Sequence, residues 1–434
     1  DEEGRFTGFD VVIGNPPYYS ISNLDQTKVL EQYYSFEKAG DIYCLFYERA
    51  NQLLRNTGIC GFITSNKWIT SRYGKSIRKY FLENTNLQLL IDFPTTKLFS
   101  EATVFTNILF FRKSRDIGPF NVMSFDLQEV RKDPKQLKEE IEKGKYSPAN
   151  LDSDSWLITN KFNYQVVNRI EDKGIPLKEW DVQFYRGITT GLNKAFHIDE
   201  EVKEELINED SSSEKLIQPL LRGKDIKRYK YKFQNKYIIF TKRGTDIDKY
   251  PAIKNYLEKY REDLTPRKKG SKSKKGRKPG NYKWFEIQDV TNYYKEFEKE
   301  KIVWIEISDK ANYCYDDQKI YLTNSAYFIS GKEIKFLLGI LNSKVSDLYF
   351  FQITPKIAGN RKRYTKQYVE QIPIIKPDKK QKKQLESLVD QILTAKEENP
   401  EADTSELEAG IDQLVYELYG LSEEEIEIVS GSVG

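Results

Sequence analysis

The chain has 434 residues, enough for two or three domains. Its 69 lysines and arginines nearly balance 66 aspartates and glutamates, and the net charge of +3 does not identify a partner. Three cysteines and one histidine are too few for a disulfide framework or a multi-histidine metal centre. We find no signal-peptide pattern and no apolar run as long as a membrane span, so a cytoplasmic location without membrane contact is expected.

The stretch that organises the first part of the chain is 9–14 and the turn after it. Four of the five residues at 9–13 are apolar and include β-branched Val and Ile, which predicts a strand buried on both faces. Two consecutive prolines end this strand, because neither can donate to a sheet ladder and each fixes its φ angle. Stiff polar turns at the carboxyl ends of buried strands are where open α/β sheets place ligand chemistry.

The turn reads Asn15-Pro16-Pro17-Tyr18 and, with the strand before it, resembles the catalytic motif of amino-group DNA methyltransferases. The resemblance implies that the Asn15 side-chain oxygen and the Pro16 carbonyl accept hydrogen bonds from the amine of a flipped adenine. Tyr18 would stack on that base. The alternative is a structural Pro-Pro turn that caps a strand.

Apolar spacing predicts five further elements in this part of the chain. They are a helix over 41–55, a strand over 59–64, a helix over 66–82 with Lys75, Arg78 and Lys79 on one side, and strands over 87–93 and 103–111. Strand, helix, strand, helix, strand, strand is half of a doubly wound sheet. The polar, aromatic segment 19–40 predicts a flexible loop with a short helix.

The same order resembles the later half of the Rossmann-like domain in TaqI-like and type IIG adenine methyltransferases. The resemblance implies that Phe46 flanks the adenine of S-adenosylmethionine and that Phe99, in 95–100, packs against the flipped base. Phe46 could equally be a core residue of an amphipathic helix.

The glycine-rich cofactor loop of that family would lie before the catalytic motif, and 187–191 lacks the G-x-G-x-x-G spacing to replace it. The chain also begins close to a strand and without Met, which suggests a fragment. We therefore expect most of the S-adenosylmethionine site in an upstream half of the same polypeptide. The sheet would then expose an unpaired edge.

Four later blocks, in order, resemble the target-recognition domain of the same enzymes. They lie at 186–196, 220–229, 341–344 and 359–368, and 370–374 closes the region. The expected fold is an α/β partial Rossmann-like methyltransferase domain (the later half of the sheet), then an α+β target-recognition domain and a C-terminal helical hairpin.

Two basic clusters suggest DNA contact. The run 267–278 carries eight cations and no acid, and its Gly and Ser residues would let it follow a phosphate backbone, with release of counterions. Arg222 could read a guanine edge, although a backbone or salt-bridge role is as plausible. His197 is expected to be structural or solvent-facing. The residues expected to bind DNA are Arg222, Arg267, Lys268, Lys269, Lys272, Lys274, Lys275, Arg277, Lys278, Arg361, Arg363 and Lys366, with Lys362 beside the last group.

The expected organisation has four parts. They are a partial methyltransferase catalytic domain over 1–115, a linker over 116–152, a DNA target-recognition domain over 153–377 and a helical hairpin over 378–434. The hairpin is predicted from apolar residues at helical spacing in 381–396 and 405–418.

The sequence thus predicts a site-specific, S-adenosylmethionine-dependent DNA adenine-N6 methyltransferase of a restriction-modification system, acting on double-stranded DNA with one adenine flipped out. Asn rather than Ser before Pro-Pro-Tyr favours adenine over cytosine N4, by resemblance. No metal site is expected. Two alternatives stay open: a DNA-recognition module without turnover in this fragment, and a methyltransferase of RNA or of protein glutamine. We find no convincing nuclease carboxylate cluster in the sequence.

Overall fold

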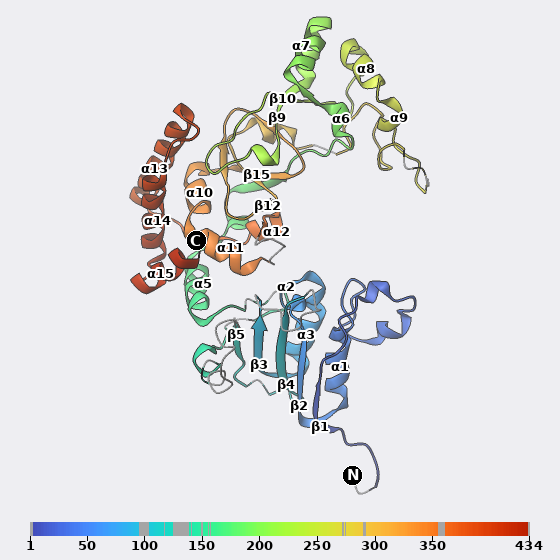
Figure 1. Ribbon diagram of the computed structural model, residues 1–434, viewed down its shortest axis with the longest axis vertical. Helices are drawn as coiled ribbons and strands as arrows, with labels where there is room; N and C mark the ends of the chain where they lie inside the picture. Colours follow the sequence, from blue (N-terminus) through green and yellow to red (C-terminus); the bar gives the residue numbers. More distant parts are fainter. Residues whose placement is uncertain are drawn as a thin grey trace. The chain divides into compact units, whose positions relative to one another are not determined.

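The computed structural model describes residues 3–94, 104–116, 118–124, 139, 141–148, 151–154, 156, 158–270, 273, 275–289, 292–354 and 361–432. The chain divides into two compact units (Figure 1). The first comprises residues 1–169 with 352–355, and the second 170–351 with 356–434. No helix in the described part is long and apolar enough to cross a membrane.

The first unit is built on a five-stranded mixed sheet with the strand order β1-β2-β4-β3-β5. The strands are β1 (Phe9–Gly14), β2 (Leu54–Ser65), β3 (Asn86–Phe93), β4 (Thr106–Arg112) and β5 (Asn121–Ser124). β1 runs parallel to β2, and β5 runs parallel to β3, whereas β4 is antiparallel to both of its neighbours. The carboxyl ends of β1, β2 and β3 therefore lie at the same end of the sheet.

The helices of this unit follow the sequence pattern. Figure 1 shows α1 (Tyr43–Leu53) and α3 (Lys75–Asn84) along the sheet, where they contact each other as well as β2 and β3. The rings of Tyr47, Trp68 and Phe81 contact one another and form an aromatic core in this unit. The expected strand–helix–strand–helix–strand–strand order is confirmed.

The expected single helix over 66–82 is wrong, because the chain breaks it into α2 (Lys67–Thr70), a 3-10 turn and α3. At Gly74 a Cβ atom would meet the Trp68 carbonyl oxygen at 1.9 Å, so the backbone packs too closely there for any side chain. The Arg78 guanidinium occupies the break. It is fully buried and donates to the carbonyls of Trp68, Ile69 and Ser71, so it does not belong to a solvent-facing basic side.

β1 differs most from its expected burial. Phe9, Val11 and Ile13 are 50%, 55% and 76% exposed, and among the described residues the strand pairs only with β2. The prediction of a strand buried on both faces is therefore wrong for this chain, whereas the expected unpaired sheet edge is confirmed. The reason is that burial depends on neighbouring elements as well as on the apolar pattern.

Residues 116–152, expected to be a linker, contribute to the sheet. β5 lies within this range and pairs in parallel with β3 from Leu89 to Asp92. Val122 and Tyr146 exchange backbone hydrogen bonds at 2.8 and 3.0 Å. The sheet therefore continues past the boundary drawn at residue 115.

The second unit contains two four-stranded sheets, with the orders β14-β9-β10-β8 and β13-β11-β15-β7. Their strands are β7 (Val182–Arg186), β8 (His197–Asp199), β9 (Ile217–Leu221), β10 (Lys236–Ile239), β11 (Lys301–Ile305), β13 (Cys314–Asp316), β14 (Tyr321–Leu322) and β15 (Ala326–Gly331). Two-stranded pairs join β12 (Ile307–Ser308) to β16 (Lys362–Arg363) and β6 (Ile175–Pro176) to β17 (Pro373–Ile374).

Short helices surround these sheets. They are α6 (Asn193–Phe196), α7 (Glu200–Glu209), α8 (Pro251–Glu258), α9 (Arg261–Leu264), α10 (Ile334–Leu341), α11 (Lys344–Ile353) and α12 (Lys366–Val369). The division between the two units falls within the preceding helix, α5 (Lys161–Lys173). One buried apolar cluster, running from Ile188 to Phe328, holds β8, β9, β10 and β14 together with α6 and α8.

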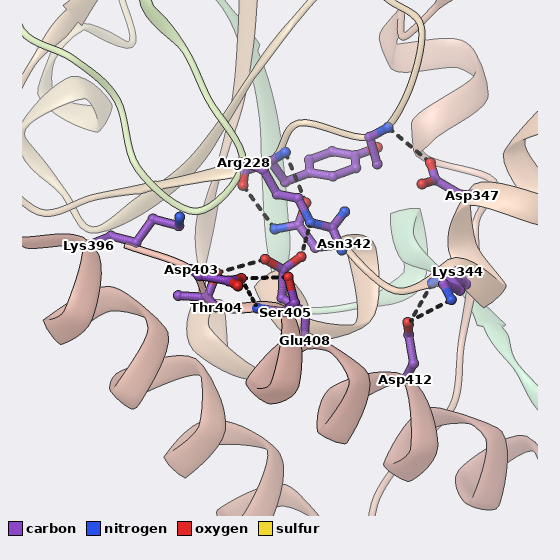
Figure 2. Close-up of polar contacts among 12 residues, drawn as sticks. Arg228, Asn342, Lys344, Asp347, Lys396, Asp403, Thr404, Ser405, Glu408 and Asp412 are labelled. Atoms are coloured by element: carbon purple, nitrogen blue, oxygen red, sulfur yellow. Dashed lines mark hydrogen bonds and ion pairs between the residues drawn. The ribbon is translucent and has the colours of Figure 1, made fainter. Parts of the chain in front are cut away.

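The expected C-terminal hairpin is present as α13 (Lys379–Glu398) and α14 (Ser405–Tyr419), and α15 (Glu423–Ser432) follows it. Figure 2 shows how α14 is attached to the rest of this unit. The Arg228 Nε donates to a carboxylate oxygen of Glu408 at 2.5 Å, and the Lys344 backbone amide donates to Asp412 at 2.8 Å.

The block 341–344, expected to belong to the recognition region, has a structural use. The Asn342 side chain accepts from the Tyr313 backbone amide at 3.1 Å and donates to the Tyr313 carbonyl at 2.9 Å. Both Asn342 and Ser343 are fully buried. The Asn342 side chain therefore joins the end of α10 to the strand region, and the Ser343 hydroxyl donates back to the Ile340 carbonyl of α10.

Candidate functional site

The Asn15-Pro16-Pro17-Tyr18 turn follows directly on β1, at the end of the sheet where β2 and β3 also finish. Asn15 and Pro17 are exposed, Pro16 is buried and Tyr18 is half-buried. The two prolines fix the backbone, so the exposed Asn15 amide is presented on a stiff support. The turn therefore offers an amide oxygen and an adjacent backbone carbonyl as hydrogen-bond acceptors.

Tyr18 is held by two neighbours. Its hydroxyl donates to the Ile63 carbonyl at 3.4 Å, and its ring packs edge-on against Tyr43, with the ring centroids 5.9 Å apart. Burial raises the pKa of Tyr18 to about 12, so the phenol is neutral at physiological pH. The residue is available as an oriented aromatic ring and not as a base.

The segment 41–46 lies beside the turn. The Ile42 amide donates to the Tyr19 carbonyl at 2.8 Å, and Ser20 forms a bridge with Asp41. The Tyr73 hydroxyl donates to Asp41 at 2.9 Å, which fixes the start of α1. The structure thus brings together two segments that the sequence assigned to the target base and to the cofactor.

Phe46 projects from the first turns of α1. Its side chain is 40% exposed, whereas its neighbours Leu45 and Tyr47 are buried in the core. The alternative that Phe46 is a core residue of an amphipathic helix is therefore wrong. An exposed aromatic ring suits stacking on a planar ligand.

The loop 19–40, expected to be flexible, has internal structure. It contains two 3-10 turns, Ile21–Asn23 and Lys28–Gln32. The Glu48 carboxylate on α1 accepts from the Tyr34 and Ser35 backbone amides at 3.1 and 2.8 Å, and from the Ser35 hydroxyl at 2.8 Å. A buried carboxylate with three donors fastens the far end of this loop to the helix.

A polar cluster at the carboxyl end of β2 was missed by the sequence analysis. Asn107 is fully buried, and its amide donates to the Ser65 carbonyl at 3.0 Å and to the Thr64 hydroxyl at 3.2 Å. Nearby, Asn66 donates to the buried Asp92 carboxylate at 2.9 Å. The available signal was a polar residue inside each apolar strand, because such residues are buried only when they are hydrogen-bonded.

Several expected site residues lie outside the described residues. They are Phe99, Lys272 and Lys274.

Arg222 is used within its own turn. Its guanidinium donates to both oxygens of Asp225, at 2.7 and 3.3 Å, and its side chain is 31% exposed. The salt-bridge role that the sequence left open is therefore present.

His197 lies next to Arg222. Burial, with the nearby Arg222 charge, lowers the pKa of His197 to about 4, so the imidazole is neutral. Its half-buried place in β8 agrees with the structural role expected for it.

The cations of the run 267–278 that the structure describes differ in exposure, and Arg267 is half-buried. Lys268, Lys269, Lys275 and Lys278 are exposed, whereas Arg277 is 3% exposed. The Arg277 guanidinium donates only to backbone carbonyls, so it has no donor left for a phosphate. The expectation of a direct DNA contact does not fit this residue.

The second basic cluster is also mixed. Arg361, Arg363 and Lys366 are exposed, but Lys362 is buried and donates to the Phe351 carbonyl at 2.9 Å. Glu306 pairs with Arg363 at 3.3 Å.

Arg186, from the first recognition block, meets this second cluster. It pairs with the same Glu306 carboxylate at 3.0 Å, and its guanidinium lies 5.4 Å from the ring centroid of Tyr327. Segments that are far apart in sequence therefore place two exposed guanidinium groups on one carboxylate.

Two known families match parts of this chain. Residues 2–99 match the family described as Eco57I restriction-modification methylase, and residues 218–374 match the family described as TaqI-like C-terminal specificity domain. The two matched regions follow one another along the chain. The first match contains the Asn15–Tyr18 turn, and the second contains the basic run 267–278 and Arg363.

Curated relatives extend the likeness over nearly the whole chain. The Type II methyltransferase M.BstVI of Geobacillus stearothermophilus is 25% identical over 98% of this chain and 76% of its own length. The Type II restriction enzyme and methyltransferase RM.Eco57I of Escherichia coli is 32% identical over 45% of this chain and 20% of its own length. Among solved structures, the Type IIL restriction-modification enzyme MmeI, in complex with DNA, matches with a TM-score of 0.57 and 16% identity. That match covers 98% of this chain and 56% of the solved chain.

Proposed function

We propose that this protein is part of a site-specific DNA methyltransferase that transfers a methyl group to N6 of adenine. The family matches and the Type II methyltransferase relatives support a site-specific DNA methyltransferase. The observation that carries the adenine assignment is the stiff Asn15-Pro16-Pro17-Tyr18 turn, with an exposed Asn15 at the carboxyl end of β1.

The turn fits the chemistry of an exocyclic amine. The adenine NH₂ is a poor nucleophile, because its lone pair is delocalised into the ring. The Asn15 amide oxygen and the Pro16 carbonyl would each accept one of its protons. Two acceptors fixed in place favour the geometry in which the nitrogen becomes tetrahedral and positive, which stabilises the transition state by preorganised dipoles.

The target base must leave the duplex to reach this turn. Tyr18 supports this step, because its ring is oriented by Ile63 and Tyr43 before any base arrives. Stacking of a base on an aromatic ring contributes about 1–3 kcal/mol, which offsets part of the unstacking cost.

The fold around the turn supports the proposal that the first unit is the later half of a Rossmann-like sheet. The strands β1, β2 and β3 end together, with the antiparallel β4 inserted between β2 and β3. Ligands bind outside the carboxyl ends of strands in such sheets. The exposed apolar residues of β1 support a further strand outside this chain that would pair with it and carry most of the cofactor site.

One described residue of this chain, Phe46, is suited to contact S-adenosylmethionine. Phe46 is an exposed ring on α1, next to the segment that is hydrogen-bonded to Tyr19, and it would flank the cofactor's adenine. When bound, S-adenosylmethionine supplies an electrophilic methyl group on a sulfonium. The residues of this chain would then hold the target base and its acceptor amine.

DNA recognition would fall to the second unit. Its exposed cations in the run 267–278 and at Arg363 and Lys366 can neutralise phosphates, and Arg186 and Arg363 can read base edges or phosphates.

The test is methyl incorporation by the full-length enzyme with Asn15→Ala. We expect methyl transfer to fall by about 100-fold or more, as for loss of one preorganised hydrogen-bonding group in other enzymes, with DNA affinity unchanged. Asn56→Ala is the matched control, since Asn56 is exposed at the opposite end of β2. Wild-type methyl transfer by Asn15→Ala with unchanged DNA binding would refute the assignment.

A second candidate is a DNA-recognition module without turnover in this chain by itself, and the exposed β1 edge favours it. Calorimetric titration of the 434-residue chain with S-adenosylmethionine tests whether this chain binds the cofactor by itself. Binding at micromolar affinity would support a cofactor site largely within this chain. The absence of measurable heat would favour the recognition module.

A further inference from the structure

A small cavity lies in the second unit, where β8, β9 and β10 meet the helices α7 and α8. The polar residues that line it are His197, Asp199, Arg222 and Lys236, with Leu220 and Tyr256 among the others. It joins the first two recognition blocks, because His197 follows the block 186–196 and Arg222 belongs to the block 220–229. Its volume is about 290 Å³, just below the range of about 300–1,000 Å³ typical of small-molecule sites. The space therefore suits one charged group with its immediate neighbours and not a whole cofactor.

Arg222 is fixed in orientation and keeps donors free. Its Nε and Nη2 donate to the two carboxylate oxygens of Asp225, at 2.7 and 3.3 Å. Among the residues that the structure describes, none accepts a hydrogen bond from its Nη1. Because the five N–H donors of a guanidinium lie in one plane, the two on Nη1 are held rigidly without a protein partner. The side chain is 31% exposed, which leaves these donors open to a ligand.

The carboxylates around the cavity are already engaged by the protein. Asp199 caps α7, where it accepts from the Val202 amide at 3.2 Å. Glu200, the next residue, accepts from two neighbouring side chains at 2.6 and 3.4 Å. The Lys236 Nζ lies 4.0 Å from Asp199 and has no closer partner in the described part of the chain. The polar groups left without partners are therefore donors, which favours an anion as the ligand.

The imidazole of His197 lies beside these cations. Its Nε2 is shielded from solvent and has no hydrogen-bond partner among the described residues. Burial, with the Arg222 charge, lowers the pKa of His197 to about 4. An anion held by Arg222 would offset that charge and make protonation of the imidazole less costly. Since His197 is the one histidine in the sequence, its signal reports on this cavity alone.

We propose that the cavity binds one phosphate group, whose oxygens accept hydrogen bonds from the free Arg222 donors and from the Lys236 ammonium. Hydrogen bonds between such cations and phosphate are short and strong, and a planar guanidinium can meet two phosphate oxygens at once. Leu220 and Tyr256 would contact the carbon atoms of an attached sugar. A phosphodiester of the DNA backbone is the expected source, and this part rests on the proposed DNA-reading function.

The experiment follows the Cε1–H resonance of His197 by NMR in the 434-residue chain, labelled with ¹³C at the histidine Cε1. Inorganic phosphate and a short DNA duplex of mixed sequence are the two probes, each titrated at constant ionic strength with KCl as the blank. We expect a saturable shift of the resonance and a higher pKa of His197 at saturation, because the bound anion offsets the Arg222 charge. Saturation by the duplex identifies DNA as the source, and saturation by inorganic phosphate alone identifies a free phosphate. No saturable shift with either probe would overturn the proposal.

Two variants test the contacts. Lys236→Gln removes a cation whose nearest carboxylate is 4.0 Å away, so it disturbs no strong protein contact. It should weaken phosphate binding by about 10-fold, as expected for loss of one charge-assisted hydrogen bond, and Arg222→Gln should weaken it at least as much. Lys232→Gln is the matched control, because Lys232 is exposed shortly before β10 and does not line the cavity. Unchanged affinity in both cavity variants, or an equal loss in Lys232→Gln, would overturn the proposal.

The phosphate site and the DNA-reading function fail in different ways. Anisotropy of a labelled duplex over a range of KCl gives the salt slope, log K against log[KCl], which is about −0.9 per phosphate neutralised. If wild type shows no salt-dependent binding of the duplex, the DNA-reading function fails, and a saturable shift with inorganic phosphate still supports the phosphate site. If wild type binds the duplex and the His197 resonance responds to neither probe, only the phosphate site fails.

Discussion

The hydroxyl of Tyr18 donates a hydrogen bond to the backbone carbonyl of Ile63, across 3.4 Å. This contact ties the turn after β1 to β2, and the edge-on packing on Tyr43 sets the plane of the ring. The hydroxyl thus serves to orient the ring, and the ring face is the part that would meet a flipped base.

Replacement of Tyr18 should separate these two contributions. Tyr18→Ala removes the stacking surface, worth about 1–3 kcal/mol, and should lower kcat/KM for methyl transfer by about 5- to 150-fold. Tyr18→Phe keeps the ring and loses one hydrogen bond, about 0.5–1.5 kcal/mol. Steady-state methyl transfer by the full-length enzyme checks both, and a loss for Phe as large as for Ala would contradict a stacking role.

The pH dependence of Tyr18→Phe gives a separate prediction. Because burial raises the pKa of Tyr18 to about 12, the hydroxyl keeps its proton over the usual assay range. The ratio of wild-type to Tyr18→Phe activity should therefore be constant from pH 7 to pH 9.5. A ratio that changes within this range would mean that the phenol exchanges a proton during the reaction.

The sequence predicted the elements of the first unit well, because apolar spacing and turn residues are local signals. It failed on β1, since the exposed fractions of Val11 and Ile13 depend on which strand pairs with them. It also failed on Arg277. Charge counting treats all cations alike, whereas a guanidinium fork can be satisfied entirely by backbone carbonyls in the interior.

The candidate site was predictable only in part, for the same reason. The Asn15–Tyr18 turn is contiguous, so its residue types alone identified it. Asn107 and Glu306 act on segments far from them in sequence, at Ser65 and Arg186, and no local pattern announces such partners. Long-range hydrogen bonds and ion pairs require the fold.

Arg363 should contribute to DNA affinity through its charge. It is 51% exposed on β16 and shares the Glu306 carboxylate with Arg186. If Arg363 contacts one phosphate, Arg363→Gln should make the salt slope of binding to a mixed-sequence duplex shallower by about 0.9. If it reads a base instead, the slope should stay and the methylated sequence should become degenerate at one position. If Arg363→Gln causes neither change, Arg363 does not contact the DNA. Lys379→Gln is the matched control.

Asp347 should make the second unit less stable as pH rises. Its carboxylate accepts from the Ala311 amide at 3.0 Å but is buried, and burial raises the pKa of Asp347 to about 6, an effect that Arg228 opposes and Asp412 reinforces. The folded state therefore holds its proton more tightly than the unfolded state, and this stabilisation is lost as pH rises from about 4 through about 6.

Asp347→Asn keeps the acceptor for the Ala311 amide and removes the titration. The stability of the variant relative to wild type should therefore be about 1.4 kcal/mol greater at pH 7.5 than at pH 5, because only wild type loses stability over this range. Urea unfolding at the two pH values, followed by tryptophan fluorescence, measures it. Asp390→Asn, which changes an exposed carboxylate on α13, should show a much smaller change, and an equal difference for both variants would contradict the assignment.

Lys301 and Asp316 form an ion pair between β11 and β13 in which both side chains are fully buried. Lys301 also donates to the Phe297 carbonyl at 2.5 Å, and Asp316 accepts from the Tyr231 hydroxyl at 3.1 Å. Lys301→Met would leave a buried carboxylate without its cation, and such changes cost about 3–5 kcal/mol. We expect a large loss of stability in the second unit.

Urea unfolding of the whole chain, followed by hydrogen exchange in β11 and β13, checks the Lys301 prediction. Lys299→Met is the control, because Lys299 is 60% exposed and its pair with Glu296 lies at the surface, where ion pairs contribute about 0–1 kcal/mol. A second variant, Lys301→Met with Asp316→Leu, removes both charges and should recover part of the stability. If the double variant is no more stable than Lys301→Met, the unpaired Asp316 charge is not the cause of the loss.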